Sequence, residues 1–576
     1  MQKIDLKEII ESKAPEFLDS IPEFLRGMVL SILNKILYIR EVNNSLERFL
    51  DKKDFDFIDE LFDYLDFSYN LSSSDKLRIP SEGRLIIVSN HPLGALDGLA
   101  LLKAVGEVRK DVRIVANDIL LSLPNLSNLF LPFDVFSVSS QKKYLSYIKG
   151  ALENDEVIIL FPAGEVSRLT LRGIKDRKWM AGAVKLAKTY NSPVLPFHIK
   201  ARNSILFYLV SAIIDSMAIF MLAGQIFNKR GKTINLKAGN LIPAEVFSTE
   251  TVKVPVLTKL LKRHVYRLGN NKSGIFKTVN TIIHPVDKKI IRKELNGSKL
   301  LGYTYDSKKI YLTDYEKTPN TIKEIARLRE ITFRKVGEGT GMKLDFDSYD
   351  AYYKHLVLWD EEELEIVGSY RIGICSEISA KKGIAGLYNS SLYSFTGEFN
   401  EILVKSIELG RSFIQQKYWR SSALDYMWQG IAAFLSEYPG VRYLFGAVSI
   451  SNSYNPDAQA MIVYFYKKWY SHEKNLANAT ERYIVPKLQQ EHLAGIMGSD
   501  NYEEDFKSLK TALKNFGYSV PVLFKKYTEL CNYGGVKFMD FGRDNEFKTI
   551  DGLMLLDLEE VKPEKRKRYY SAKSFA

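Results

Sequence analysis

The chain has 576 residues, of which 46% are hydrophobic and 26% are charged, and it carries a formal net charge of +12. This composition excludes a disordered or fibrous chain, and the length exceeds what one hydrophobic core serves, so we expect at least two domains. The two cysteines, Cys375 and Cys531, are too few for a disulfide framework and suit a reducing environment.

A basic segment lies near the middle of the chain. Residues 251–300 contain 12 Lys and Arg and two acids, and residues 251–283 are expected to form a basic linker. Such a segment faces solvent, an anionic membrane surface or an acidic protein partner. Nucleic acid is not expected, because no recognisable nucleic-acid-binding motif accompanies the charge.

The apolar run Ile205–Gly224 is about long enough to span a bilayer. Asp215 lies near its centre, where a carboxylate costs roughly 2.5–3.5 kcal/mol. Strand-like runs over Pro193–His198 and Ile234–Ala238 flank it, and strands of one sheet cannot lie on opposite sides of a membrane. We therefore expect helices that are buried or dip into the membrane, so that the protein lies on the membrane and does not cross it. The charged, amphipathic N-terminus lacks the continuous apolar core of a signal peptide.

The first half of the chain is predicted to be an α/β domain preceded by a helical extension. Residues 1–75 carry apolar residues at helical spacing. Residues 76–250 alternate strand-like and helical runs, which is typical of an α/β layer fold. The expected strands are Leu85–Ser89, Val112–Ala116, Val157–Phe161, Val194–His198 and Ile234–Ala238, and the expected helices include Leu99–Val108 and Trp179–Tyr190.

A second alternating region over residues 284–560 predicts a second α/β domain, and residues 561–576 form a basic tail that we expect to be frayed. The expected helices are Thr321–Val336, Leu424–Leu435 and Pro456–Tyr470, and the expected strands are His355–Trp359, Ile366–Ile372, Tyr443–Ile450, Val536–Phe541 and Gly552–Leu558.

One loop of the first half combines a histidine with an aspartate. Asn90 and His91 follow the apolar strand, and Asp97 comes six residues after His91 at the head of an apolar helical run. A carboxylate that returns to an imidazole can orient a general base and stabilise its charged form. Taken alone, the pattern also fits an accidental turn in which Asp97 caps the helix.

Two further blocks follow in order, Phe161-Pro-Ala-Gly-Glu-Val-Ser-Arg168 and Pro193-Val-Leu-Pro-Phe-His198. With the Asn90-His91…Asp97 block, they make residues 75–245 resemble the glycerolipid acyltransferases of the lysophosphatidate acyltransferase type. The resemblance implies that His91 removes the proton of an acceptor hydroxyl, that Asp97 fixes the tautomer of His91, and that no acyl-enzyme forms. The residues that it implies for binding substrate or donor are Asn90, Phe161, Gly164, Glu165, Arg168 and Pro193.

The sequence departs from this family in two places. Five residues separate His91 from Asp97 where the family has four, and Gly94 is expected to absorb the extra residue as a bulge or turn. Ala163 occupies the usual Glu position, so Glu165 and Arg168 are carried over only as nearby substitutes. Three other conspicuous side chains are interpreted as structural: Ser167, Trp179 and His198.

The second half has its own ordered set of charged blocks: Arg329 to Arg334 on a helix, Gly337-Glu-Gly-Thr-Gly341, Asp345-Phe-Asp-Ser-Tyr-Asp350, Gly368-Ser-Tyr-Arg371 and Glu408-Leu-Gly-Arg411. The set resembles the autoinducer-synthase branch of the N-acyltransferase (GNAT) fold and, more closely, the N-acyltransferase of ornithine-lipid synthases. The glycine-rich loop is not a Walker motif. The coenzyme A loop of most acetyltransferases of this fold is absent, which favours an acyl carrier protein as donor.

N-acylation requires a neutral amine, whose ordinary pKa of about 8 lets a carboxylate or a bound water serve as base. By the resemblance, Glu408 and Asp347 are candidate bases, and Arg329, Arg371 and Arg411 bind the phosphopantetheine or the amino-acid carboxylate. Any of them can instead belong to a structural ion-pair network. Glu408 and Arg411 share a face in a helix but point apart in a regular strand, and the sequence leaves this open.

The two resemblances together imply a bifunctional aminolipid synthase. The second domain would join a 3-hydroxyacyl group to the α-amine of ornithine, the favoured head group, or of glycine, and the first would acylate the 3-hydroxyl of that lyso-lipid. No bound cofactor or metal is implied. Acyl carrier protein or acyl-CoA would deliver the acyl groups, at the cytoplasmic face of the inner membrane with peripheral contact to anionic lipid. The alternatives are a lysophospholipid acyltransferase with an accessory GNAT-like domain, and a non-catalytic membrane-binding or haemolysin-like protein.

Overall fold

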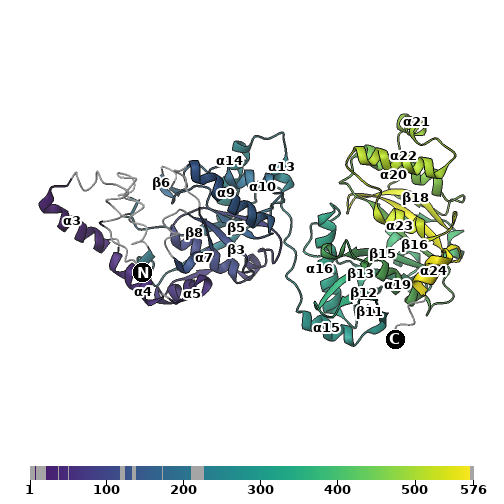
Figure 1. Ribbon diagram of the computed structural model, residues 1–576, viewed down its shortest axis with the longest axis horizontal. Coiled ribbons are helices and arrows are strands. Elements are labelled where there is room, and N and C mark those ends of the chain that lie inside the picture. Colours follow the sequence, from purple (N-terminus) through teal and green to yellow (C-terminus); the bar gives the residue numbers. More distant parts are fainter. Residues whose placement is uncertain are drawn as a thin grey trace. The chain divides into compact units, whose positions relative to one another are not determined.

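The computed structural model describes residues 7, 21–36, 38–49, 51–116, 124–132, 138–170, 173–205, 207–208 and 226–570. The chain divides into two compact units, residues 1–284 (unit 1) and 285–576 (unit 2), and each is an α/β structure (Figure 1). Most of the apolar run 205–224 lies outside the described residues. Among those that are described, no helix is long and apolar enough to cross a membrane.

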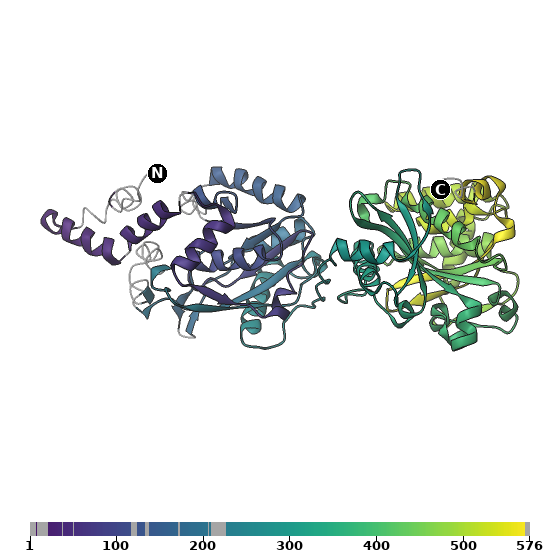
Figure 2. The ribbon, with the colours of Figure 1, turned by 90° about the horizontal axis from the view of Figure 1, so that it is seen from below.

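Unit 1 contains a seven-stranded sheet with the order β1-β9-β8-β2-β5-β3-β4. Its core strands are parallel, and the antiparallel β9 extends them. All five predicted strands form, and β2 is buried along its whole length because helices cover both faces of the sheet (Figure 2). The strands are β1 (Ser68–Asn70), β2 (Leu85–Ser89), β3 (Val112–Ala116), β4 (Phe130–Pro132), β5 (Val157–Leu160), β8 (Val194–Lys200) and β9 (Thr233–Ala238).

Two helices pack on one face of this sheet and three on the other. α5 (Asp54–Tyr64) and α7 (Ala95–Gly106) share a core with Leu85 and Ile87. α9 (Val138–Glu153), α10 (Gly182–Thr189) and α14 (Val254–Gly269) share a second core with Ile86 and Val88. The smaller elements of unit 1 are α3 (Glu23–Ile36), α4 (Ile39–Arg48), α6 (Ser73–Lys76), the hairpin β6 (Arg168–Thr170) and β7 (Gly173–Lys175), and α13 (Glu245–Ser248).

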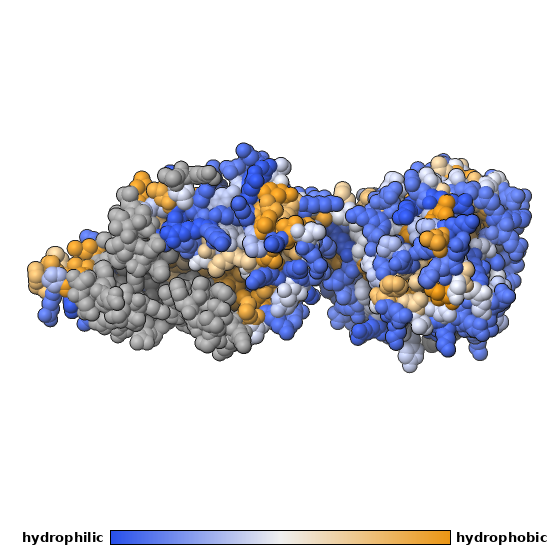
Figure 3. Space-filling model, turned by 90° about the horizontal axis from the view of Figure 1, so that it is seen from above, coloured by the Kyte–Doolittle hydropathy of each residue, from blue (hydrophilic) through white to orange (hydrophobic). Residues whose placement is uncertain are grey.

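The expected linker over residues 251–283 contains the helix α14, which is part of unit 1. Leu257, Leu261 and Val265 recur every four residues and are buried in the second core. Basic residues lie between these apolar positions, so the charge of the segment predicts a solvent-exposed linker where a helix with one buried face forms. At the other end of the unit, β1 adds a strand where only helices were expected. Helix α3 leaves Phe24, Met28 and Ile32 exposed. Figure 3 shows hydrophobic areas beside hydrophilic ones on the surface of unit 1.

Unit 2 contains an eight-stranded sheet with the order β10-β11-β12-β13-β15-β16-β19-β18. All its neighbours are antiparallel except β15 and β16. The strands are β10 (Lys299–Tyr303), β11 (Lys309–Asp314), β12 (Lys354–Asp360), β13 (Glu365–Ile374), β15 (Ser406–Ile414), β16 (Tyr443–Ile450), β18 (Val536–Asp544) and β19 (Thr549–Asp557). The helices are α15 (Lys288–Asn296), α16 (Pro319–Lys335), α17 (Cys375–Lys382), α18 (Phe399–Leu403), α19 (Ala423–Leu435), α20 (Pro456–Tyr470), α21 (Lys487–Ile496), α22 (Tyr502–Asn515), α23 (Val522–Leu530) and α24 (Pro563–Tyr570), and a small sheet joins β14 (Tyr393–Phe395) to β17 (Ala477–Ala479).

The parallel pair β15 and β16 opens after a short contact. The two strands pair only over residues 406–408 and 443–445, and β15 then has a register shift, with Arg411 at φ 49°. Beyond this point β15 pairs with β13 alone and β16 with β19 alone, so a gap opens between them.

The C-terminal tail also differs from expectation, because α24 packs Tyr569 against Trp428 instead of fraying.

Candidate active sites

The His91 ring lies beside the Asp97 carboxylate after the end of β2. His91 Nδ1 is 3.3 Å from Asp97 Oδ2, and the Asp97 side chain is fully buried while that of His91 is 18% exposed. The same oxygen accepts the backbone N–H groups of Leu93 at 2.6 Å and Gly94 at 3.2 Å. With Nδ1 directed at Asp97, the Nε2 edge of the ring is left for a substrate hydroxyl.

Gly94 absorbs the extra residue of this loop, which confirms the prediction. Its φ of 93° is a conformation that residues with a side chain rarely adopt, and Gly94 itself is the N-cap of α7. Asp97 is therefore not the N-cap residue itself but lies inside the first turn of the helix, where its side chain accepts the N–H of Gly94 in a capping box. Burial raises the pKa of Asp97, although the His91 ring and the two N–H groups act in the opposite direction.

The loop that follows β5 packs against the His91 ring. The rings of Phe161 and His91 stack with their centroids 4.0 Å apart, and the Ser167 N–H donates to the His91 carbonyl at 2.7 Å. Gly164 has φ 68°, and a Cβ there would lie 2.6 Å from Met180 Cε. The structure therefore brings the Phe161 block and the His91 loop together.

Glu165 and Arg168 form an ion pair next to this loop. Arg168 Nε lies 3.4 Å from one Glu165 oxygen, and Arg177 Nε lies 3.6 Å from the other. The Glu165 carboxylate is thus placed between two guanidinium groups.

Two other predicted site residues stabilise the sheet. Asn90 donates to the Ile199 carbonyl at 2.9 Å and accepts the Ile199 N–H at 2.8 Å, so its amide ties the end of β2 to β8. Pro193 precedes β8, and its carbonyl accepts the Ile86 N–H at 3.0 Å. Because β2 and β8 are parallel and His91 follows β2, Pro193 lies at the opposite end of the sheet and is not brought to the base.

A buried network of three arginines and three aspartates occupies the centre of unit 2. Arg329 forms a two-pronged pair with Asp350 at 2.9 and 2.7 Å, and Arg371 donates to Asp347 at 2.6 Å. The side chains of Arg329 and Arg371 are each 1% exposed, which leaves almost no surface of either for a ligand. Burial opposes ionisation of Asp350, but Arg329 and then Arg371 outweigh it and hold the pKa of Asp350 well below its ordinary value.

Arg411 connects this network to the gap between the strands. Its Nε lies 3.3 Å from Asp345 and its Nη2 3.3 Å from Asp347. The Arg411 guanidinium also lies 4.5 Å from the centroid of the Tyr388 ring and 4.3 Å from that of Phe547. Arg411 is thus held between two anions and two aromatic faces.

Glu408 is a buried acceptor with four donors. It accepts the Asn389 N–H at 2.7 Å, the Asn389 side-chain amide at 2.6 Å, the Tyr388 N–H at 3.2 Å and the Tyr353 hydroxyl. Burial raises the pKa of Glu408, while these hydrogen bonds favour the carboxylate. Its acceptor positions are filled by protein groups, so none is left for a substrate amine.

The bulge in β15 settles the orientation of Glu408 and Arg411. An inserted residue changes the alternation of a strand, so that residues three apart can face the same side. Tyr388 shows that they do, because its N–H donates to Glu408 while its ring contacts Arg411. Both side chains therefore belong to one cluster, beside the gap between β15 and β16.

Comparison with known proteins identifies both halves. Residues 9–271 match an acyltransferase family and residues 328–429 an acetyltransferase (GNAT) domain. The glycine N(alpha)-acyltransferase of Bacteroides thetaiotaomicron is 33% identical over 302 residues, which are 50% of this chain and 89% of that protein. The lyso-glycine lipid O-acyltransferase of the same species is 31% identical over 273 residues, which are 46% of this chain and 97% of that protein. The chain belongs to the aminolipid acyltransferases. A more distant relative is the L-ornithine N(alpha)-acyltransferase of Brucella abortus, 25% identical over 42% of this chain and 83% of that protein.

This aminolipid acyltransferase is an enzyme with an O-acyltransferase part and an N-acyltransferase part, as the sequence predicted. Beside the His91–Asp97 pair lies a buried aspartate, Asp176, that was not predicted from sequence. Asp176 accepts the His91 N–H at 3.2 Å, the Ser167 hydroxyl at 2.5 Å and the Trp179 indole N–H at 2.8 Å. Its own N–H donates to the Tyr266 hydroxyl at 2.8 Å. Asp176 is 3% exposed and joins the His91 loop to the Phe161 loop and to α14.

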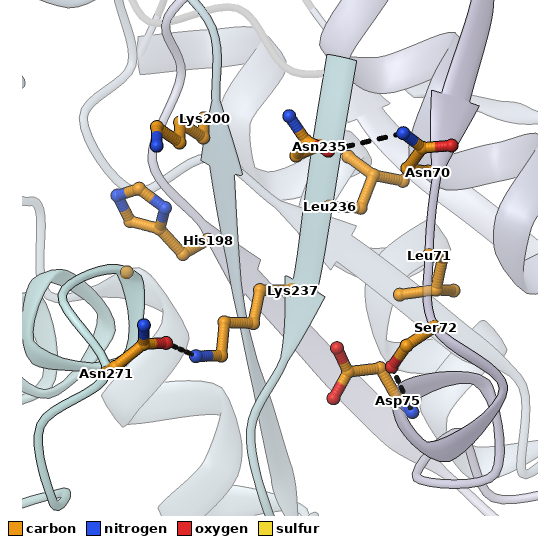
Figure 4. Close-up of a pocket in the computed structure, with 11 residues that line it drawn as sticks. Asn70, Leu71, Ser72, Asp75, His198, Lys200, Asn235, Leu236, Lys237 and Asn271 are labelled. Atoms are coloured by element: carbon orange, nitrogen blue, oxygen red, sulfur yellow. Dashed lines mark hydrogen bonds between the residues drawn. The ribbon is translucent and has the colours of Figure 1, made fainter. Parts of the chain in front are cut away.

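The aminolipid acyltransferase also has a polar pocket on the outer strands of the unit 1 sheet (Figure 4). It has a volume of about 540 Å³ and is lined by Asn70, His198, Lys200, Asn235, Lys237 and Asn271, among others, but not by His91. Burial lowers the pKa of His198 to about 4, and Lys237 and Lys200 add to this effect. His198 is therefore neutral at physiological pH, and it lines this pocket, which does not include His91.

Proposed function

We propose that the enzyme makes a diacylated glycine lipid. Unit 2 joins a 3-hydroxyacyl group to the α-amine of glycine, and unit 1 then acylates the 3-hydroxyl of the product. The relatives named for glycine are 33% and 35% identical to this chain, whereas those named for ornithine are 25–28% identical, which supports glycine over the ornithine favoured from sequence. The order follows from the chemistry, because the hydroxyl to be esterified arrives on the first acyl chain.

The buried His91–Asp97 pair carries the proposal for unit 1. His91 Nε2 takes the proton of the 3-hydroxyl while the oxygen attacks the carbonyl of a thioester. The new C–O bond replaces the C–S bond, and the thiolate leaves with the proton that His91 had taken. Asp97 holds the ring by Nδ1 and stabilises the imidazolium, and the stacked Phe161 restricts the tilt of the ring.

The gap between β15 and β16 supports the proposal for unit 2. Its edges carry backbone N–H and C=O groups without a strand partner, which can pair with the amides of an extended pantetheine arm. We propose acyl carrier protein as the donor, because its acidic surface complements the excess of basic residues. Peripheral contact with the cytoplasmic face of the inner membrane is supported by the exposed apolar face of α3.

Lipid analysis tests this function directly. The full chain is expressed in a bacterium that lacks aminolipids, and the lipids are examined by mass spectrometry. We expect a new amide-linked and ester-linked lipid whose head-group fragment has the mass of glycine. A His91→Ala variant should accumulate the mono-acylated amide. An ornithine fragment would contradict the head group, and the absence of any amide-linked lipid would contradict the function.

A further inference from the structure

The carboxylates near the gap between β15 and β16 differ in whether an oxygen is free to accept a proton. The carboxylates of Asp345, Asp347 and Asp350 form ion pairs with arginines, and the Glu408 carboxylate accepts hydrogen bonds from several N–H and O–H donors. Glu330 accepts from Arg334, from both donors of Thr340 and from the Gly341 N–H. Asp544 accepts two backbone N–H groups and the Tyr388 hydroxyl. Within the described residues near this site, the carboxylates of Glu338 and Glu546 have neither a hydrogen bond nor an ion pair, and of these two only Glu546 is exposed.

Glu338 lies on a loop that is held firmly in place. The bonds to Glu330 close the far end of the loop, and the Glu338 N–H donates to the Phe333 carbonyl at 2.8 Å. The Ser451 hydroxyl donates to the Val336 carbonyl, and a Cβ at Gly337, which has φ 82°, would lie 3.4 Å from that hydroxyl oxygen. The loop is therefore attached at Ser451, just after the end of β16, and it carries one carboxylate side chain, that of Glu338.

The end of α16, which leads into the loop, is linked to Arg411 on β15 through one intervening ring. Phe333, at the end of α16, makes an edge contact with Phe547 at 6.5 Å, and Phe547 lies 4.3 Å from the Arg411 guanidinium. Asp551 on β19 is the register partner of Ser449 on β16, beyond the paired part of β16. The loop thus lies beside the part of β16 that does not pair with β15.

We propose that Glu338 is the general base of the N-acyltransferase. This assignment rests on the proposed N-acylation and replaces Glu408 and Asp347 in that role. The Glu338 carboxylate takes one proton from the ammonium of the amino acid. The neutral nitrogen attacks the thioester carbonyl, the C–N bond forms and the C–S bond breaks. The departing thiolate takes the second proton from nitrogen, and Glu338 returns its proton to solvent.

The surroundings of Glu338 suit this role. Burial and the charge of Asp551 raise the pKa of Glu338 to about 7, and the Tyr454 hydroxyl is a further titratable group near it. Arg334, from α16, is neutralised by Glu330. A base is most effective when its pKa lies near the working pH, whereas an ordinary glutamate with a pKa of about 4.3 is a weaker base.

A Glu338→Gln variant of the full chain tests the assignment, with glycine and a 3-hydroxyacyl carrier protein as substrates and release of the thiol as readout. We expect kcat/KM to fall by roughly 10²–10³-fold at pH 7 and the rise of the wild-type rate through about pH 7 to disappear. Raising the pH should restore part of the activity, because the amine then loses its proton unaided. Glu338→Asp should retain more activity than Glu338→Gln.

Glu546→Gln is the matched comparison, because Glu546, on the neighbouring β18–β19 turn, also has no hydrogen bond or ion pair and also has a raised pKa, but is exposed. It should keep the wild-type rate and pH profile. A folded Glu338→Gln enzyme within threefold of the wild type at every pH overturns the assignment, as does loss of the pH dependence in Glu546→Gln alone. If the wild-type chain forms no amide with any amino acid, the proposed function itself fails and the assignment fails with it.

Discussion

An Asp97→Asn substitution should remove most of the O-acyltransferase activity. The Asp97 oxygen lies 3.3 Å from His91 Nδ1. At an effective dielectric constant of about 20, a full charge pair at this separation is worth about 5 kcal/mol, which bounds the stabilisation of the imidazolium. An asparagine at this place also offers an N–H₂ group to Nδ1, which favours the wrong tautomer of the ring. We therefore expect kcat to fall by roughly 10³–10⁴-fold.

The assay uses purified mono-acylated glycine lipid, so that the N-acyltransferase step does not limit the rate. KM should change little, because Asp97 is fully buried and lies behind the ring. Asp75→Asn serves as the control, because Asp75 is another buried aspartate of unit 1, paired with Arg78 at 2.8 Å. A folded Asp97→Asn enzyme with more than a tenth of the wild-type kcat would refute the role assigned to the pair.

Three further substitutions test other parts of the structure. Asp176→Ala should lower both the thermal stability of the enzyme and its O-acylation rate, because it leaves buried donors unpaired at about 1–3 kcal/mol each. N-acylation by the same preparation should stay unchanged, and equal loss of both activities would contradict this. Gly164→Ala should reduce O-acylation because its Cβ meets Met180, whereas Gly173→Ala, also at positive φ but with open space around it, should leave the rate near that of the wild type. Asp350 has a depressed pKa, so it stabilises the folded state above about pH 4 and this contribution is lost as the pH falls. Asp350→Asn should therefore flatten the acid side of the unfolding curve measured by circular dichroism, and an unchanged curve would contradict the ion-pair network.

Ten of the fifteen strands described in the two main sheets were predicted from sequence, because a strand buried on both faces is a short apolar run, whereas β1, β4, β10, β11 and β15 were not. Leu85–Ser89 and Tyr443–Ile450 form with the bounds that the sequence predicts. The prediction was less successful where charge or length concealed the pattern. Helix α14 falls in the expected linker because Lys259, Lys262, Arg263 and Arg267 are interspersed among its five buried residues, and β1 is only three residues long. The strand β15 was left undecided because a bulge breaks its alternation.

The candidate sites likewise contain features that could be predicted from the sequence and features that could not. The Gly94 turn was predictable, because six residues of local chain decide whether a carboxylate can return to a histidine. Asp176 was not, because it reaches His91 from 85 positions away in the sequence. That hydrogen-bond donors occupy all acceptor positions of Glu408 could not be predicted either, because these donors lie on segments that come near Glu408 only after folding.

The sequence by itself determined that two acyltransferase domains follow one another and that His91 and Asp97 form a pair, because block order and loop length are properties of the chain. The tertiary structure decided which carboxylates are free to accept a proton. That property depends on desolvation and on donors from distant segments, as the contrast between Glu408 and Glu338 shows. Neither burial nor hydrogen-bond saturation is encoded in the spacing of residues along the chain.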